Sequence, residues 1–516
     1  MASGGNGYGS GIYCIDSSPI INNNTIRNNG GKGGETEDTA IDSRSGNGYG
    51  VYCDNSSPTI SNNSISNNDG TGGNYNTNIP YVSAGPGYSY GIYCINISSP
   101  IIRNNSIDNN VGIGGGNSSS FNKNEIFNYN NLPGGNSGGS GYGYGIYSDN
   151  SYPNISGNTI INNGGNGGEG YNCRDSDFHY EGLEGDKYYT TIRASGGKGK
   201  GYGIYCNASN PQIDNNLLCN NCGVGGYGIE CANGGNGYGI GIYFNDYLSG
   251  NINNNTILNN AGIGGNSELG YDGYGYGYGI GTNSSSPNIL NNIVFNNKGE
   301  DYGYGIYADS ILTTLEYNLF FQNDVNGFGV PPYFGVIVTV NANGDSCDTY
   351  CNLFMDPLFV DTLTSNYHLT DNSPCIDAGN PDTTGLNLPE FDLDGNPRIY
   401  NSIVDMGCYE WQGIGVDDWH NSTMTDVLYQ NYPNPFSTST TISYNSASNK
   451  HEITQIKIYN TRGQLVKTLL PITNNKLQIT NVIWDGKDEN GNPLSNGIYF
   501  YQLKTASYNG IKKMII

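Results

Sequence analysis

Charge, tryptophan, histidine and long apolar runs are all scarce in this sequence. Charged residues make up 13% of the 516 positions, and 21 Lys or Arg stand against 45 Asp or Glu, for a formal net charge of −24. Nucleic acids, anionic lipids and polyanionic polysaccharides need clustered basic residues, so this balance excludes them as partners. No apolar run reaches the roughly 18 residues of a transmembrane helix. The chain opens on repeat-like sequence without a signal peptide, so we expect a fragment or a processed form.

Glycine and asparagine dominate what is present. Gly accounts for 79 residues and Asn for 81, together about 31% of the chain. Both residue types favour turns over strands and helices, which excludes a helical protein. Two classes of protein have such a composition, a disordered chain and a repeat fold with fixed turn positions. The two differ in one respect, because only a repeat fold keeps apolar residues at constant offsets.

A Gly-aliphatic-Tyr-small block recurs eight times and opens a constant frame. The blocks begin at Gly11, Gly50, Gly91, Gly145, Gly203, Gly241, Gly279 and Gly305. Taking the Pro that usually follows as the origin, the second residue after it is always aliphatic: Ile21, Ile60, Ile102, Ile155, Ile213, Ile252, Ile289 and Leu315. The fifth is assigned as Asn in seven units, Asn24, Asn63, Asn105, Asn158, Asn216, Asn255 and Asn292, and as Leu319 in the eighth. This constant register excludes disorder.

Each unit contains three short strand candidates separated by one or two polar residues. Such a unit predicts an all-β fold, a right-handed parallel β-helix solenoid whose coils stack at the strand spacing of about 4.8 Å. Stacking brings equivalent residues together, so we expect the seven Asn residues to form a ladder of side-chain amides. The longer units carry Gly/Asn-rich insertions, which we place as a coat at one corner of the coil.

The repeat over residues 1–345 resembles the right-handed parallel β-helix of the pectin-lyase-like superfamily. That superfamily contains lyases, hydrolases, adhesins and purely structural proteins. The resemblance therefore implies a fold and leaves the function open.

Residues 346–420 break the repeat and are interpreted as closing coils and a C-terminal cap. The runs Asp392-Leu-Asp-Gly-Asn-Pro-Arg398 and Val404-Asp-Met-Gly-Cys-Tyr-Glu410 resemble the C-terminal end of many bacterial extracellular β-helix proteins. We expect this segment to cover the last coil, whose backbone groups would otherwise be unpaired. Two candidate disulfides would pin it, Cys375 with Cys408 and Cys347 with Cys351.

Residues 421–516 change character again, with nine basic and five acidic residues. Alternating apolar positions separated by Gly/Asn turns predict a small β-sandwich. The runs Leu428-Tyr-Gln-Asn-Tyr-Pro-Asn-Pro-Phe436, Trp484-Asp-Gly-Lys-Asp488 and Gly497-Ile-Tyr-Phe-Tyr501 closely resemble the type IX secretion system C-terminal sorting domain. The resemblance implies a secreted or bacterial cell-surface protein that contacts the secretion machinery through this domain.

No metal or cofactor is expected. Asp392, Asp394 and Asn396 have the spacing of a calcium loop, but Pro397 and Ile403 replace its required Gly and Glu. Asx-turns are therefore the preferred interpretation, with calcium as the alternative. No active site is evident either; Asp175, Asp177 and His179, in the polar insertion 173–193, are weak catalytic candidates only.

Tyrosine, with 44 residues, provides the clearest candidate surface. Alternation along the Gly-Ile-Tyr-Cys block turns Ile and Cys inward and Tyr outward. This predicts an exposed ladder of Tyr13, Tyr52, Tyr93, Tyr147, Tyr205, Tyr243 and Tyr307. Such a strip can stack on sugar rings or on another copy of the chain, unless the insertions fold over it.

The sequence therefore predicts an exported structural or adhesive β-helix protein. Its expected partners are surface glycans or further copies of itself, with end-to-end filaments built on the open first coil. The alternatives are a polysaccharide lyase or glycoside hydrolase, and a glycan-binding module without catalysis.

Overall fold

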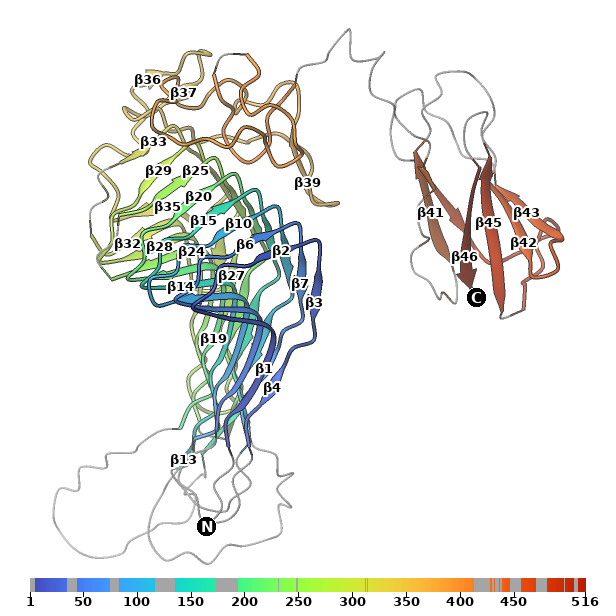
Figure 1. Cartoon of the computed structure of the whole chain (residues 1–516), viewed down its shortest axis with the longest axis horizontal. Coiled ribbons are helices and arrows are strands. Elements are labelled where there is room, and N and C mark those ends of the chain that lie inside the picture. The colour runs from blue at the N-terminus through green and yellow to red at the C-terminus, as the bar shows by residue number, and fades with distance from the viewer. Residues whose placement is uncertain are drawn as a thin grey trace, which may run out of the picture. The chain divides into compact units, whose positions relative to one another are not determined.

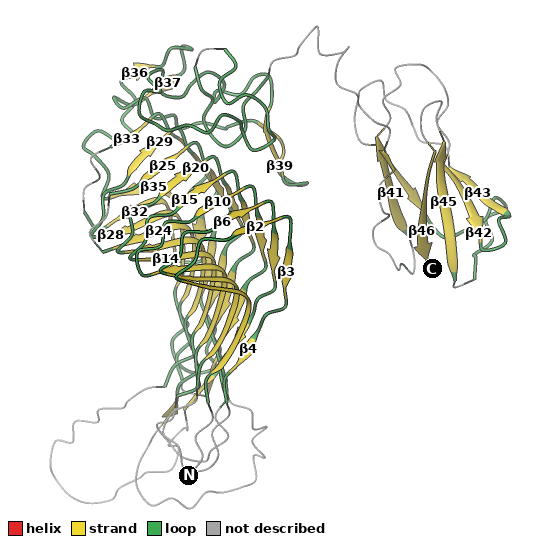
Figure 2. Ribbon diagram, in the orientation of Figure 1, coloured by secondary structure: helices red, strands yellow, loops and turns green. Residues whose placement is uncertain are grey.

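The computed structural model consists of two compact units, Met1–Gly413 and Ile414–Ile516. In the first it describes residues 5–34, 44–74, 83–116, 135–172, 194–230, 232–246, 249–310, 312, 314–401 and 403–412. In the second it describes residues 427–428, 431, 436, 439–445, 456–469, 480–495, 497–504 and 509–516. Strands and loops account for this part of the chain, which contains no helix (Figure 2) and hence none long and apolar enough to span a membrane.

Four parallel sheets run along the first unit (Figure 1). The long sheet contains β1 (Gly7–Ile15), β5 (Gly46–Asp54), β9 (Gly87–Ile95), β14 (Gly141–Asp149), β19 (Gly199–Asn207), β24 (Gly237–Asn245), β28 (Gly275–Asn283), β32 (Tyr302–Ala308) and β35 (Val325–Phe328). The second sheet contains β2 (Ile20–Asn22), β6 (Thr59–Ser61), β10 (Ile101–Arg103), β15 (Asn154–Ser156), β20 (Gln212–Asp214), β25 (Asn251–Asn253), β29 (Asn288–Leu290) and β33 (Leu315–Glu316). The third sheet contains β3 (Thr25–Arg27), β7 (Ser64–Ser66), β11 (Ser106–Asp108), β16 (Thr159–Ile161), β21 (Leu217–Cys219), β26 (Thr256–Leu258), β30 (Ile293–Phe295) and β34 (Leu319–Phe321). The fourth, here called the glycine sheet, contains β4 (Gly31–Lys32), β8 (Gly70–Thr71), β12 (Val111–Ile113), β17 (Gly164–Asn166), β22 (Cys222–Val224), β27 (Ala261–Ile263) and β31 (Lys298–Gly299).

Each coil turns four side chains into a continuous core that is apolar except at Ser148 and Thr282. In the third coil these are Ile92, Cys94, Ile102 and Ile107, all fully buried. The register pairs equivalent residues of successive coils; Ile102, for example, lies between Ile60 and Ile155. The structure therefore confirms the predicted all-β class and the stacked parallel β-helix.

Asn-Asn pairs turn the chain at two corners of most coils; Gly157, Tyr317 and Gln322 replace the first Asn at three of these corners. In the pair Asn104-Asn105 the first residue adopts a left-handed φ of 53°, which Asn tolerates better than most residues. The second is buried, and its Nδ2 donates to Asn158 Oδ1 in the next coil at 3.0 Å and to the Ile60 carbonyl in the previous coil at 2.9 Å. Each ladder thus satisfies its own buried polar groups.

The Asn ladders extend further than the sequence pattern predicts. The eighth coil carries Asn318 at the ladder position, so the assignment of Leu319 to it is wrong; Leu319 is instead a buried residue of the third sheet. Asn352 continues the same ladder beyond the repeat. A second ladder runs beside the first through Asn29, Asn68, Asn110, Asn163, Asn221, Asn260, Asn297 and Asn323.

The glycine-rich insertions begin as the glycine sheet, a conformation that the sequence did not reveal. This sheet packs against the first halves of the long strands, and together they form a flat extension of the three-sided core (Figure 1). Glycine lines the contact: a Cβ on Gly199 would lie 1.9 Å from the Val224 carbonyl oxygen. Backbone hydrogen bonds link the outgoing and returning segments, as from Gly139 N to Gly115 O at 2.8 Å. Close backbone approach thus explains much of the glycine content.

The closing segment both extends the last coil and covers one side of the solenoid. Leu353 N donates to the Asn318 carbonyl at 2.8 Å, which continues the third sheet past β34. The remainder, with β36 (Thr339–Val340), β37 (Ser346–Cys347), β38 (Phe359–Asp361) and β39 (Asn366–Leu369), lies along the later strands of the second and third sheets (Figure 1). Tyr367 and Met406 belong there to the same buried apolar cluster as Leu258 and Ile293. The sequence predicted closing coils and a cap, but not that the segment lies along the side of the solenoid.

The remaining strands form small sheets. In the first unit, β13 (Gly135–Asn136), β18 (Gly170–Asn172) and β23 (Gly228–Glu230) form one sheet. In the second unit, β40 (Val427–Leu428), β41 (Thr440–Asn445) and β44 (Thr480–Trp484) form an antiparallel sheet, as do β42 (Ile456–Asn460), β43 (Leu465–Leu469), β45 (Ile498–Lys504) and β46 (Asn509–Ile515). One core containing Ile458, Trp484 and Tyr501 joins these two antiparallel sheets, as in a small β-sandwich.

Substituting a contact glycine should destabilise the solenoid. Gly199→Ala places a methyl group against two carbonyl oxygens, so we expect a loss of at least about 2 kcal/mol in unfolding free energy. Denaturant unfolding followed by circular dichroism measures it. Lys198→Ala, which changes the exposed preceding residue, is the matched control. Equal stability of the two variants would contradict close backbone packing.

Breaking the Asn ladder should also destabilise the fold. Asn216→Ala removes the oxygen that accepts from Asn158 N at 2.9 Å and from Asn158 Nδ2 at 3.0 Å. Because buried polar groups lose partners, we expect a loss of about 2–4 kcal/mol. Asn154→Ala, on an exposed position of β15, should change stability by less than about 0.5 kcal/mol in the same measurement.

Candidate functional site

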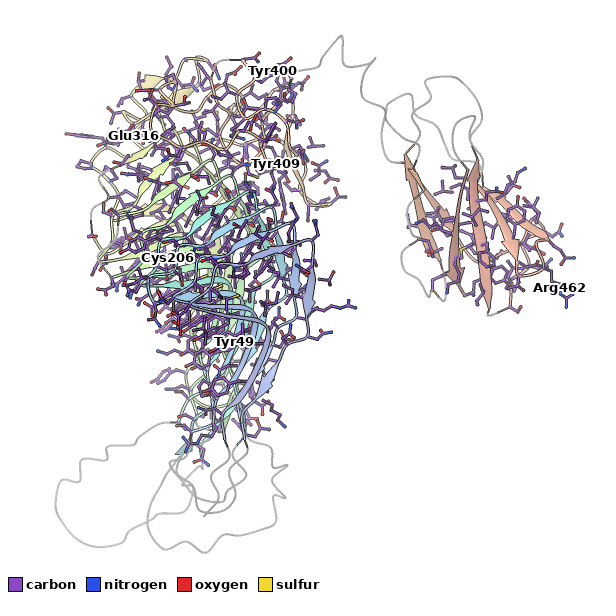
Figure 3. All side chains as sticks on the ribbon, in the orientation of Figure 1. Tyr49, Cys206, Glu316, Tyr400, Tyr409 and Arg462 are labelled. Carbon is purple, nitrogen blue, oxygen red and sulfur yellow. The ribbon has the colours of Figure 1, made fainter. Side chains whose placement is uncertain are left out.

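The outer surface of the long sheet carries three columns of tyrosine, here called the tyrosine face. Its strands bear Tyr mainly at their second, fourth and seventh positions, while glycines at the first, third and fifth face inward. The first column is the predicted ladder, Tyr13, Tyr52, Tyr93, Tyr147, Tyr205, Tyr243 and Tyr307. The middle column contains Tyr49, Tyr90, Tyr144, Tyr202, Tyr278 and Tyr304, and the edge column contains Tyr8, Tyr88, Tyr142, Tyr238, Tyr276 and Tyr302. Figure 3 labels Tyr49 on this sheet.

Rings of the first column stack on one another from coil to coil. Successive centroids from Tyr13 to Tyr243 lie 4.4–5.4 Å apart, with interplanar angles of 3–25°. Tyr13 is 58% exposed, whereas the other six are half-buried. Their exposure is therefore lower than the sequence predicts, because the middle column packs against them.

The middle column is buried and was not predicted. Tyr90, Tyr144 and Tyr202 are only 5–7% exposed and stack at 5.1–5.2 Å. Each meets the first-column ring of its own strand edge-on, as Tyr90 meets Tyr93 at 4.6 Å and 67°. Its signal in the sequence is an alternation of Gly and Tyr before the repeat blocks, complete as Gly-Tyr-Gly-Tyr-Gly at residues 141–145 and 275–279 and with single substitutions in the other coils.

Two irregular coils compensate for each other within these columns. Ile240 replaces a middle-column tyrosine, and Gly281 replaces a first-column tyrosine in the next coil. A Cβ on Gly281 would lie 2.6 Å from a ring carbon of Tyr243, so that ring fills the space above the glycine. Tyr278 then stacks on Tyr307 at 5.0 Å and 9° and restores the column.

The edge column contains the one basic residue of the tyrosine face among the described residues. Lys200 Nζ lies 5.3 Å from the ring centre of Tyr142 and 5.6 Å from that of Tyr238, a cation–π arrangement in two successive contacts. Burial, reinforced by the neighbouring charge of Lys198, lowers the pKa of Lys200. Lys200 thus occupies the position of a tyrosine in the edge column and contacts the tyrosine rings of both neighbouring coils.

Stacking determines what the tyrosine face offers to a ligand. Each interior ring uses both faces on its neighbours, so ring edges and hydroxyl groups are what remains for solvent. Burial raises the pKa of Tyr93 and of Tyr205 to about 12. Their hydroxyls therefore stay protonated near neutral pH and can donate hydrogen bonds.

A row of amides and carboxylates borders the first column at the last position of the long strands. Asn207 Nδ2 donates to Asp149 Oδ1 at 2.8 Å, and Asn245 Nδ2 donates to Asn207 Oδ1 at 2.7 Å. Asn283 continues the row at 2.7 Å. Tyrosine hydroxyls and amide or carboxylate oxygens thus run side by side at the repeat of the coils, about 4.8 Å.

The closing segment holds a cluster of buried ionisable groups. Asp405 accepts hydrogen bonds from Asp377 N at 2.7 Å and from Trp411 N at 2.6 Å. Arg398 is 2% exposed, and its Nη2 lies 3.7 Å from Glu410 Oε2. Burial raises the pKa of both acids, and the guanidinium opposes that rise. These contacts fold the segment on itself and suit a structural role.

The other candidate residues contribute no assembled site within the described residues. Asp392 Oδ1 accepts Asp394 N at 3.0 Å and Asn396 N at 2.7 Å, the contacts of an Asx-turn. No group of three or more His, Cys, Asp or Glu there is arranged to hold a metal ion. Asp175, Asp177 and His179 lie outside the described residues.

The four candidate disulfide cysteines are free thiols in this structure. Cys347, Cys375 and Cys408 are buried, and Cys351 is half-buried. All four pack in or against the core between the closing segment and the third sheet. The two pairings stay predictions.

Raising the pH should loosen the closing segment. Asp214, buried beneath it on β20, has a pKa raised to about 7 by burial, against about 3.9 for an unfolded Asp. Because the folded pKa is the higher one, this stabilisation is complete below about pH 4 and is lost as the pH rises through about 7, up to about 4 kcal/mol. Hydrogen exchange of residues 386–410 should therefore speed up between about pH 4 and 8 and level off above that, after correction for intrinsic exchange. Asp214→Asn should reduce that dependence and the exposed Asp371→Asn should not; loosening on acidification instead would contradict the assignment.

Comparison with known proteins identifies the second unit. Residues 430–516 match the family described as the secretion system C-terminal sorting domain. No curated protein and no solved structure matches the chain. The match agrees with the antiparallel strands β41–β46 and with the sequence resemblance. Residues 430–516 are therefore a type IX secretion sorting domain, and the chain that carries it is exported to the cell surface or the extracellular space.

Proposed function

We propose that this chain is an adhesive scaffold of the cell surface that binds uncharged, hydroxyl-rich polysaccharide along its tyrosine face. The observation that carries the proposal is the first tyrosine column beside the amide and carboxylate row, which is continuous over four coils from Asp149 to Asn283. Phenol hydroxyls donate and accept, amides do both, and carboxylates accept, which matches the hydroxyl groups of a sugar polymer.

The geometry favours edge-on binding over ring stacking. Interior rings such as Tyr147 have neighbours on both faces, at 5.0 Å and 5.2 Å, so a sugar ring cannot lie flat on them. A polymer laid along the column would instead meet a hydroxyl at every coil. Contacts that are weak singly become strong when many act in one chain.

Charge selects the class of polysaccharide. The net charge of −24, with Asp54 and Asp149 bordering the first column, repels polyanions. Export to the cell surface or extracellular space brings the solenoid to where polysaccharides of cells and matrices occur.

Removing hydroxyls while keeping rings tests this proposal. Tyr93→Phe, Tyr147→Phe and Tyr205→Phe together preserve stacking and delete three hydrogen-bonding groups, so we expect at least about tenfold weaker binding to an insoluble neutral β-glucan. Co-sedimentation of the full chain measures the affinity. Tyr333→Phe, 71% exposed but outside the columns, is the control and should bind like wild type.

Salt provides a second readout. Binding through neutral groups should change little between about 0.05 and 0.5 M salt, because screening acts on charge pairs. Unchanged binding by the triple variant, or no binding of the wild type to any neutral polysaccharide tested, would overturn the proposal.

A further inference from the structure

The edge column contains a pair of stacked phenols that is separated from the other tyrosines of that column. Tyr88 and Tyr142 lie 4.8 Å apart at 9°, and both are half-buried. Asn47 precedes the pair in register and Lys200 follows it, so the stack is interrupted on both sides. The two rings come from successive coils whose tyrosines are 54 residues apart in sequence.

We propose that Tyr88 and Tyr142 are a site of oxidative cross-linking, in which a dityrosine bond joins the third coil to the fourth. The oxidant is hydrogen peroxide acting through a peroxidase. Each phenol loses one electron and one proton, and the two radicals couple through their ortho carbons. The hydrogen on each coupled ortho carbon then moves as a proton to the oxygen of the same ring, which restores both phenols. The balance is two tyrosines and one H₂O₂ giving one dityrosine and two H₂O.

Geometry favours this pair over the rings of the middle column and over the tyrosines outside the columns. Coupling requires two rings that are held together, that meet an oxidant, and that can tilt to bring two ortho carbons into bonding distance. Middle-column rings such as Tyr144 are 6% exposed and stacked on both faces, so they lack access and freedom. Well-exposed rings outside the columns, such as Tyr152 and Tyr333, have access but belong to no stacked column.

The cross-link would lock two coils at the extension of the solenoid. Residues 89–141, between the two tyrosines, would become a closed loop, which restricts the unfolded chain as a disulfide does. Export places the protein where extracellular oxidants can reach it. The proposal is independent of polysaccharide binding, which rests on the hydroxyls of a different column.

Peroxidase treatment of the purified full chain tests the site. We expect dityrosine fluorescence, a band that stays monomeric on a denaturing gel, and a Tyr88–Tyr142 cross-linked peptide by mass spectrometry. Tyr88→Phe or Tyr142→Phe should reduce that peptide at least tenfold, whereas Tyr276→Phe, in the same column, should leave it unchanged. Because Phe keeps the ring, circular dichroism should show unchanged folding in all three variants.

Two outcomes would overturn the assignment. One is cross-linking that maps mainly to Tyr152 or Tyr333 and joins separate molecules, which would mean that exposure alone decides. The other is a chain that forms no Tyr88–Tyr142 peptide although free tyrosine added to the same reaction is converted to dityrosine.

Discussion

The structure depends on one constraint, the stacking of equivalent residues at the strand spacing of about 4.8 Å. A residue type persists in a column only if it interacts favourably with itself. Asparagine donates to and accepts from its own kind, tyrosine stacks on tyrosine, isoleucine packs on isoleucine, and glycine lets backbones approach. Like charges repel when they lie opposite each other, so a charged column is excluded. Asp54 and Asp149 are accordingly separated by Ile95, and Lys200 lies between two tyrosines.

Much of the fold can be predicted from the sequence, because stacked residues recur at constant positions within each repeat unit. The core positions and seven residues of the first Asn ladder could be placed residue by residue. The glycine sheet could not, since glycine carries no side chain whose periodicity marks a face, and its contacts are between backbones. The position of the closing segment was also hidden. The sequence indicates it only through the outward residues of the third sheet. These residues change from charged in early coils, as Arg27 and Asp108, to apolar in later coils, as Leu258 and Phe295.

The tyrosine face shows how much of a candidate site the sequence pattern can predict. Alternation predicted the orientation of Tyr93 and its equivalents, but their exposure depends on a second column that packs edge-on against them. That column requires the strand to continue through the Gly-Tyr-Gly run, beyond the block that defines the repeat. The sequence shows that Ile240 and Gly281 each replace a tyrosine, but it does not show that the two substitutions compensate. Only the structure shows that the Tyr278 ring stacks on Tyr307 where Gly281 lacks a side chain.

The same stacking that stabilises the solenoid also limits how it can recognise a partner. Stacked rings cannot offer their faces, so a tyrosine column acts as a row of hydroxyl groups rather than as an aromatic platform. A single row of weak hydrogen bonds gives little affinity per coil, and useful affinity requires a partner that is itself long and regular. Loss of one contact is then a small fraction of the whole, which lets the column tolerate Gly281 without losing continuity. A repeat of this kind is therefore better suited to holding a polymer along its length than to enclosing a small molecule.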